Sequence, residues 1–368
     1  MLRIPCLPGR SPTAPVLRGL LAALLLATLA GPAAAATVTT VMSGLDNPRG
    51  MAFGPEGGLY VAEAGRGGAG PCTVLRGQLA CYGPSGALTR LWRGTQQRVA
   101  TGLPSYLMAS LEAAGPHDVS FQGRGGAFVT IGFGGDPNLR AAFGPVGQGF
   151  GTLVQVPASG RWRFVADVSA HEIAENPGGG PFIDSNPFGI EAEPGGQIVV
   201  DAGANALLRV ASNGQIETLA VFPSRLARST DAVPTDVALG PDGAWYVSEL
   251  TGVPFTPGAA RVYRVVPGLE PEIWLQGFDL KTLIDLAWGP DGSLYLLEHA
   301  TGAFFSGPGR IRRVDLDAFG NPLPPVGVDT GATVLDRPTS LLVDDDGTIY
   351  VTNHGVSIGT GEVLKIVP

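Results

Sequence analysis

One pattern recurs along this chain: an apolar strand, a tight turn such as Gly240-Pro241-Asp242-Gly243, and a second strand with an aromatic residue near its start. In such a turn Pro presets φ, Asp accepts a local backbone N–H, and Gly takes the corner with positive φ. The β-branched and aromatic runs that follow favour strands. The copies start at Gly50, Asp118, Gly189, Asp236, Asp285 and Ser340. Six copies of one two-strand unit predict a repeat architecture.

The spacing of the copies indicates how many strands each unit holds. Three of the five intervals suit one four-stranded blade of about 40–50 residues, and the other two hold insertions. The sixth copy leaves room for only three strands, whereas the strand-like segment Thr37–Met42 stands alone before the first copy. Pairing the two would close a ring and cover an exposed edge. We therefore predict an all-β, six-bladed β-propeller closed by the N-terminal strand, with residues 37–368 as a single domain.

A stacked superhelix is the structural alternative, but it needs capping units and gives the first strand no role. The Trp-Asp signature of one common blade type is absent, so the units are closer to the NHL type. Composition agrees with an all-β chain rich in turns, because Gly 55 and Pro 32 accompany only 15% charged residues. The net charge is −8 and no basic cluster is present, which excludes a nucleic-acid partner.

Residues 1–36 have the layout of a secretory signal: scattered arginines, an apolar run from Leu20 to Leu29, then small residues. We expect an exported protein, periplasmic or secreted, without a membrane span and monomeric. Cys6 would leave with the signal. Cys72 and Cys81 would then form a disulfide across a small loop, with two free thiols as the alternative. No Cys/His cluster supplies the ligands of a zinc site.

Two short motifs resemble catalytic signatures without their structural context. Residues 65–70 match the Gly-x-Gly-x-x-Gly fingerprint, but Pro71 and a second loop follow where a helix must begin. Residues 355–359 match a nucleophile elbow, yet no His follows them. The acids of the turn at 344–346 lack the glutamate that a calcium loop of the helix-loop-helix type requires. None of the three carries a site.

Propeller geometry instead places equivalent repeat positions around one funnel. The start of each first strand shares a face with the end of each second strand, and acids near these points need a cation, water or basic partners. The predicted funnel residues are Arg49, Glu63, His117, Asp118, Phe188, Thr235, Asp236, Glu249, Asp285, Glu298 and His354. The candidate Ca²⁺ ligands among the strand ends are Glu63, Glu249, Glu298 and Asn353. The alternative is that these acids bond backbone N–H groups at strand ends.

Several segments together resemble the ScyD/ScyE family over nearly the whole chain after residue 36. They are Gly44–Pro55, Gly70–Cys72 with Cys81–Gly86, Gly115–Val119, Ser185–Gly189 and Pro234–Val237. The resemblance implies an exported propeller associated, by family name, with scytonemin pigment biosynthesis clusters. It carries no catalytic residues to this sequence.

Two functions follow from the predicted funnel. The first is a binding scaffold that takes a small molecule, a glycan or a protein on the funnel face. The second is a Ca²⁺-dependent enzyme of the lactonase (hydrolase) or sugar-dehydrogenase type, in which the ion activates substrate or water. Mixed residue types at the strand starts favour binding.

Overall fold

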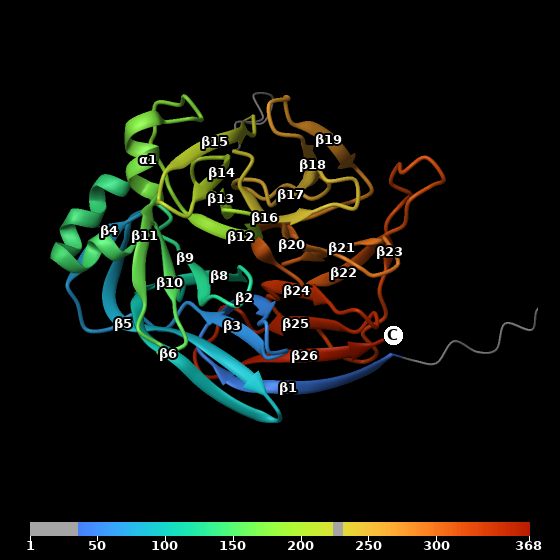
Figure 1. The fold of residues 1–368 in the computed structure, drawn as a ribbon, viewed down its shortest axis with the longest axis horizontal. Helices are drawn as coiled ribbons and strands as arrows, with labels where there is room; N and C mark the ends of the chain where they lie inside the picture. Colours follow the sequence, from blue (N-terminus) through green and yellow to red (C-terminus); the bar gives the residue numbers. More distant parts are fainter. Residues whose placement is uncertain (1–35, 224–230) are drawn as a thin grey trace, which may run out of the picture. The chain divides into compact units, whose positions relative to one another are not determined.

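The structure, a computed structural model, describes residues 36–223 and 231–368. The described strands form six sheets, and the first strand of each sheet lies at the centre of the array, next to the first strands of its two neighbours (Figure 1). This arrangement confirms the predicted all-β propeller. The chain is a six-bladed β-propeller. The predicted signal segment falls outside the described residues except for Ala36, so export stays a prediction.

The blades follow the chain in order. Blade 1 contains β2 (Pro48–Phe53), β3 (Leu59–Glu63), β4 (Cys72–Leu75), β5 (Gln78–Trp92), β6 (Thr95–Met108) and β7 (Ala113–Ala114). Blade 2 contains β8 (Pro116–Phe121), β9 (Ala127–Ile131), β10 (Thr152–Val156) and β11 (Arg163–Asp167). Blade 3 contains β12 (Pro187–Glu193), β13 (Gly196–Asp201), β14 (Ala206–Ala211) and β15 (Ile216–Val221).

The second half of the ring is more regular. Blade 4 contains β16 (Pro234–Leu239), β17 (Trp245–Glu249), β18 (Arg261–Val265) and β19 (Glu272–Gln276). Blade 5 contains β20 (Leu283–Trp288), β21 (Leu294–Glu298), β22 (Arg310–Val314) and β23 (Val326–Gly327). Blade 6 contains β24 (Ser340–Val343), β25 (Ile349–Asn353), β26 (Gly361–Val367) and β1 (Thr37–Leu45).

The repeat turn forms as its residues predict. Gly240 N–H donates to the carbonyl of Ala244 (2.8 Å), and Asp242 Oδ1 accepts the N–H of Ala244 (3.2 Å). Gly243 has φ +79°, which a side chain would strain. At Gly240 a Cβ would lie 2.3 Å from the ring of Tyr246, the aromatic residue of the next strand. The turn and the aromatic therefore define one unit.

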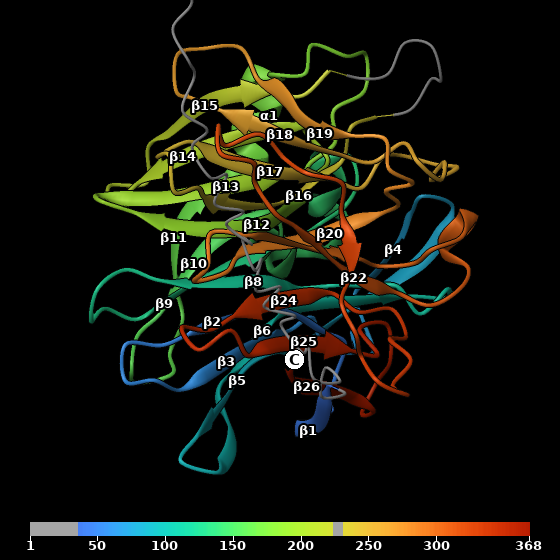
Figure 2. The same cartoon turned by 90° about the vertical axis from the view of Figure 1, so that its right-hand side faces the viewer.

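The ring closes through the first strand. β1 pairs antiparallel with β26, from Thr37 opposite Val367 to Leu45 opposite Gly361, and lies at the outer edge of blade 6 (Figure 2). This confirms the predicted closure. Blade 1 packs against blade 6 through Phe53 of β2 and Tyr350 of β25, whose ring centroids are 5.4 Å apart.

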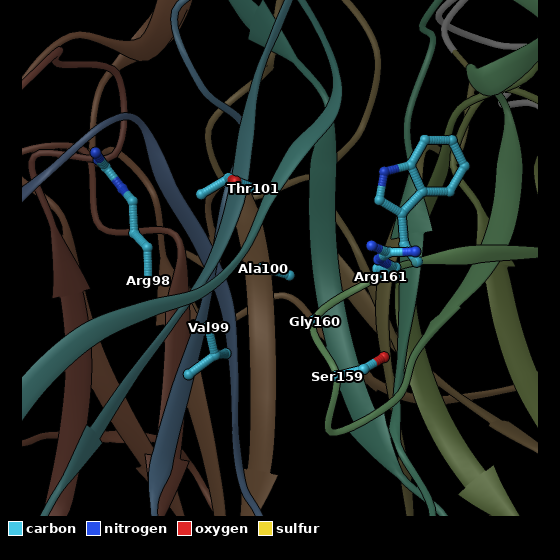
Figure 3. A pocket seen from close by; sticks show the side chains of 8 residues that line it. Arg98, Val99, Ala100, Thr101, Ser159, Gly160 and Arg161 are labelled. Carbon is cyan, nitrogen blue, oxygen red and sulfur yellow. The ribbon is translucent and has the colours of Figure 1, made fainter.

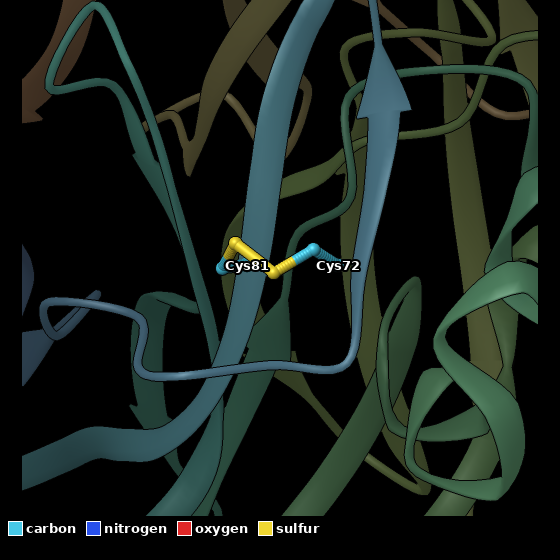
Figure 4. Close-up of a disulfide and its surroundings, with 2 residues drawn as sticks. All are labelled: Cys72 and Cys81. Atoms are coloured by element: carbon cyan, nitrogen blue, oxygen red, sulfur yellow. A yellow bond between two sulfur atoms is a disulfide. The ribbon is translucent and has the colours of Figure 1, made fainter.

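The two insertions extend blades 1 and 2. In blade 1, β5 and β6 form a long hairpin to which β4 is added, and the predicted disulfide joins Cys72 of β4 to Cys81 of β5 (Figure 4). In blade 2, the glycine-rich insertion contains the 3₁₀ segment η1 (Pro137–Gly149), and helix α1 (Val168–Glu175) follows the blade. A short 3₁₀ turn, η2 (Ala303–Phe305), lies in blade 5. No helix of the described part is long and apolar enough to cross a membrane.

Candidate functional site

Three predicted funnel acids, Asp118, Asp236 and Asp285, occupy one repeat position on the central strands, and the structure brings them together. Each carboxylate accepts a backbone N–H from a neighbouring blade through Oδ2: Asp118 from Ile190 (2.9 Å), Asp236 from Leu286 (3.1 Å) and Asp285 from Leu341 (3.0 Å). These three hydrogen bonds therefore join adjacent blades. They also place three acidic side chains close to the axis of the propeller.

Two of the six copies have glycine at this position, because a larger residue there would collide with the aspartate of the next blade. A Cβ on Gly50 would lie 1.8 Å from Asp118 Oδ1, and one on Gly189 would lie 2.7 Å from Asp236 Oδ1. Both glycines thus make room for the carboxylate of the following blade. Ser340, the sixth member, accepts the N–H of Met51 through Oγ (3.1 Å).

Burial and mutual repulsion change the protonation of these acids. Burial raises the pKa of the Asp118 and Asp236 carboxyls well above their usual range, and the charge of Asp285 raises both further. Burial raises the pKa of Asp285 to about 6. The three carboxyls therefore keep their protons to higher pH than isolated aspartates do, Asp285 to about pH 6.

A chamber of about 360 Å³ extends from these aspartates along the six central strands. Its far end is formed by the last residues of those strands, including Phe53, Leu239 and Trp288, where Phe53 is 39% exposed and Leu239 is 51% exposed. The chamber therefore reaches the surface on the side of the repeat turns. Its lining contains no Lys, Arg or His.

Glu191 of β12 also lines the chamber and was not among the predicted site residues. Burial raises the pKa of its carboxyl to about 7. The sequence alone could have identified Glu191, because the other five repeat copies have a small or apolar residue at the aligned position. Those residues are Ala52, Ser120, Ala238, Ala287 and Leu342.

The predicted residues at the strand starts lie beyond the aspartates, at the other end of the channel, and none of them lines the chamber. His117 Nδ1 donates to the carbonyl of Pro187 (3.1 Å), and Thr235 Oγ1 donates to that of Leu283 (2.9 Å). The ring of Phe188 lies 4.7 Å from that of His117. Burial lowers the pKa of His117 to about 3, so the imidazole is neutral and Nδ1 carries its proton.

Arg49 is also buried at this end. Its guanidinium donates to the carbonyls of Gly355 and Ala113, the latter at 3.0 Å, and burial lowers its pKa to about 10. The bond to Gly355 links blade 1 to blade 6, whereas the bond to Ala113 lies within blade 1. The strand starts therefore hold the blades together here, and a ligand contact by Arg49, His117, Phe188 or Thr235 stays a prediction.

The acids at the ends of the second strands do not meet at the axis. Glu63 is fully buried in blade 1, where it accepts from Arg98 Nη2 (2.6 Å) and the N–H of Asp46 (2.7 Å). Glu298 accepts from Arg310 and from the N–H of Lys281 (2.8 Å) in blade 5. These carboxylates hold in place the segment that precedes the first strand of their blade. This agrees with the alternative prediction, that the acids bond backbone N–H groups at strand ends.

Asn353 and Glu249 complete the set of candidate Ca²⁺ ligands. Asn353 Oδ1 accepts the N–H of Asp336 (2.7 Å), and Glu249 is fully buried. In residues 36–223 and 231–368, no three His, Cys, Asp or Glu side chains form a group that could hold a metal ion. The four residues therefore do not fit the Ca²⁺ site predicted for them, because a second strand lies one position out from the axis and Glu63, Glu298 and Asn353 bond within their own blades.

His354, the last predicted funnel residue, lies at the surface. Its Nδ1 is 3.2 Å from Asp336 Oδ2, and its Nε2 is 3.6 Å from Glu362 Oε1. It belongs to the rim of blade 6 and not to the chamber lining.

Comparisons with solved structures agree with the fold. The chain is similar to a protein of unknown function from Bacteroides thetaiotaomicron (TM-score 0.54, 12% identity, covering 90% of this chain and 76% of that one). It is also similar to a calcium-binding protein, regucalcin, from Agrobacterium tumefaciens (TM-score 0.50, 13% identity, covering 89% and 95%). Virginiamycin B lyase from Staphylococcus aureus gives a weaker likeness (TM-score 0.47, 11% identity, covering 90% and 99%).

At such low identities the first two likenesses show the propeller fold alone. No protein-family model matches the chain, and no curated protein matches its sequence. The comparisons do not name the ScyD/ScyE family. The family membership that the sequence suggested therefore stays a prediction.

Proposed function

We propose that this propeller is a binding protein for a small organic cation, an amine-bearing molecule that enters the chamber from the side of the repeat turns. The observation that carries the proposal is the lining: four carboxyl groups and no basic side chain around about 360 Å³. Chambers of this size hold small ligands, and a few convergent polar groups orient them.

The protonation of the chamber acids supports a cationic ligand. The negative charge of Asp285 raises the pKa of Asp118 and of Asp236, and Asp118 raises that of Asp236 further, because like charges repel in a buried space. An ammonium group would replace that repulsion with attraction and would lower the same pKa values. Binding near neutral pH should therefore release protons from the chamber.

An organic cation suits the chamber better than a bare metal ion. The described residues offer no group of three ligands for a metal, whereas a longer molecule can reach several separated carboxyls. Phe53, Phe121 and Trp288 line the end near the surface, where aromatic rings attract ammonium groups and pack against carbon chains.

The test is calorimetric titration with putrescine, agmatine and benzylamine. We expect saturable binding of at least one of them. In Asp236→Asn the affinity should fall about tenfold or more, because Asn keeps an acceptor for Leu286 but cannot ionise when the amine binds. Heats measured in buffers of different ionisation enthalpy should show proton release. Asp345→Asn, which changes an exposed acid of a repeat turn, should bind like the wild type.

Two outcomes would refute the proposal. One is the absence of saturable binding up to concentrations on the order of 10 mM. The other is equal binding by the wild type and Asp236→Asn, which would make the aspartates interblade ties and nothing more.

A further inference from the structure

A second hollow, which we call the interblade groove, lies between blades 1 and 2, away from the central channel. It measures about 500 Å³ and is lined by β6 and by the turn from β10 to β11 (Figure 3). Its lining residues are Arg98, Val99, Ala100, Thr101, Ser159, Gly160, Arg161 and Trp162. The closeness of the two elements depends on Gly160, where a Cβ would lie 2.3 Å from the carbonyl oxygen of Val99.

The charge of the interblade groove is opposite to that of the chain. No Asp or Glu lines it, although the chain carries a net charge of −8. Arg98, on one side, already pairs with Glu63 and with Asp46 (3.0 Å). Arg161, on the other side, is exposed and forms no ion pair with a described residue. Arg161 therefore offers a bidentate donor to an incoming anion.

Trp162 gives the same wall an apolar face. Its indole N–H donates to the carbonyl of Gly102 on β6 (3.3 Å), which fixes the ring, and the side chain packs against the core shared by blades 1 and 2. The hydroxyls of Thr101 and Ser159 and the backbone of the β6 edge lie around it. A fixed indole beside hydroxyls and backbone amides suits a ligand with C–H faces and many hydroxyl groups.

We propose that the interblade groove binds a carboxylated saccharide of the uronic acid class. Arg161 takes the carboxylate, Trp162 packs against a sugar face, and Thr101 and Ser159 bond to sugar hydroxyls. The volume admits one or two sugar rings. The site is separate from the chamber, so this proposal and the proposed amine binding stand or fall independently.

Calorimetric titration with digalacturonic acid tests the inference. We expect one saturable site whose affinity falls about tenfold in Arg161→Ala. Arg163→Ala is the matched control: Arg163 lies on the same hairpin but outside the lining and donates to Gln155 (2.8 Å), so its loss should leave binding unchanged. Trp162→Phe, which keeps a ring but loses the N–H bond, should weaken binding less than Arg161→Ala.

Maltose and acetate separate the two halves of the recognition. Both should bind much more weakly than digalacturonic acid, because each supplies only the sugar or only the charge. The proposal is overturned if Arg161→Ala binds digalacturonic acid like the wild type, if maltose or acetate binds as well as the uronate, or if no saturation is reached. Asp236→Asn should bind the uronate normally.

Discussion

The central chamber and the interblade groove both concentrate one sign of charge, but water reaches them very differently. Asp236 and Asp285 are each 8% exposed, whereas the Arg98 side chain is 40% exposed and Arg161 lies at the surface. Two charges at the same separation interact several times more strongly in the buried environment. The chamber therefore alters the protonation of its own residues, whereas the groove leaves its arginines charged and balances one of them with buried acids.

The largest effect should come from the arginine that belongs to the fold. Arg98→Ala leaves the carboxylate of Glu63 buried without its ionic partner, which should lower the free energy of unfolding by about 2–3 kcal/mol. That range is below the value for a fully buried pair because water already reaches Arg98. Urea denaturation measures the change. Arg161→Ala should unfold like the wild type; equal losses in both variants would erase the distinction between the two arginines.

The next effect concerns the chamber acids. The pKa of Asp285 is about 6 in the folded chain against an ordinary 3.8, so the folded state binds the extra proton between these pH values. Wild-type stability from this group is greatest below about pH 4 and is lost as the pH rises through about 6. Asp285→Asn removes that loss.

We expect Asp285→Asn to be more stable than the wild type by about 1–2 kcal/mol at pH 8, with the difference vanishing near pH 4. Thermal unfolding of both proteins across this pH range provides the measurement. A variant that is less stable at every pH would show that the carboxylate serves only to hold Leu341.

A smaller effect should separate Glu191 from the aspartates. Glu191→Gln keeps the shape of the chamber lining but removes a charge nearer to the surface, so amine affinity should fall about three- to fivefold. Calorimetric titration of this variant beside Glu175→Gln, an exposed change on α1, checks the result. An unaltered affinity would confine recognition to the three aspartates.

Salt should give the smallest difference. Raising NaCl from about 50 mM to 500 mM shortens the screening length to a few ångströms and should weaken uronate binding in the groove about threefold. Amine binding in the chamber should change less, since little salt enters a buried space. Parallel titrations decide this, and an equal salt response at both sites would contradict the contrast in burial.

Much of the fold was predictable because the repeat is a local signal. Gly240–Gly243 and its counterparts encode a turn and two strands each, and ring closure follows from the lone strand Thr37–Met42 and the short sixth unit. The bond between Cys72 and Cys81 was equally accessible, because only those cysteines remain after the predicted signal. Helix α1 and segment η1 lie outside the repeat and carry no such signal.

The site was predictable only in part, because repeat alignment gives equivalence around a ring but not the direction of a side chain. It placed Asp118, Asp236 and Asp285 together correctly. It also grouped Glu63 with Glu298, although each turns into its own blade to bond an arginine and a backbone N–H. The position of the chamber along the propeller axis depends on the volumes of side chains from all six central strands. No single repeat copy contains that information.

The interblade groove could not be derived from the sequence. It exists because the long β6 of one insertion passes beside the β10–β11 turn, which is distant in sequence. Neither segment contains a recognisable binding motif. Contacts of this kind arise only after the blades pack.

The seam between β1 and β26 has a consequence for how the protein forms. β1 is synthesised before every blade, and its partner strand is synthesised after all the others. Blade 6 therefore cannot be completed until almost the whole described chain is present, and β1 must stay unpaired in the meantime. Contacts between segments so far apart in sequence form slowly. Until then, the open edge of β26 can pair with the β1 segment of another copy, so assembly at high concentration should favour strand-exchanged dimers over closed rings.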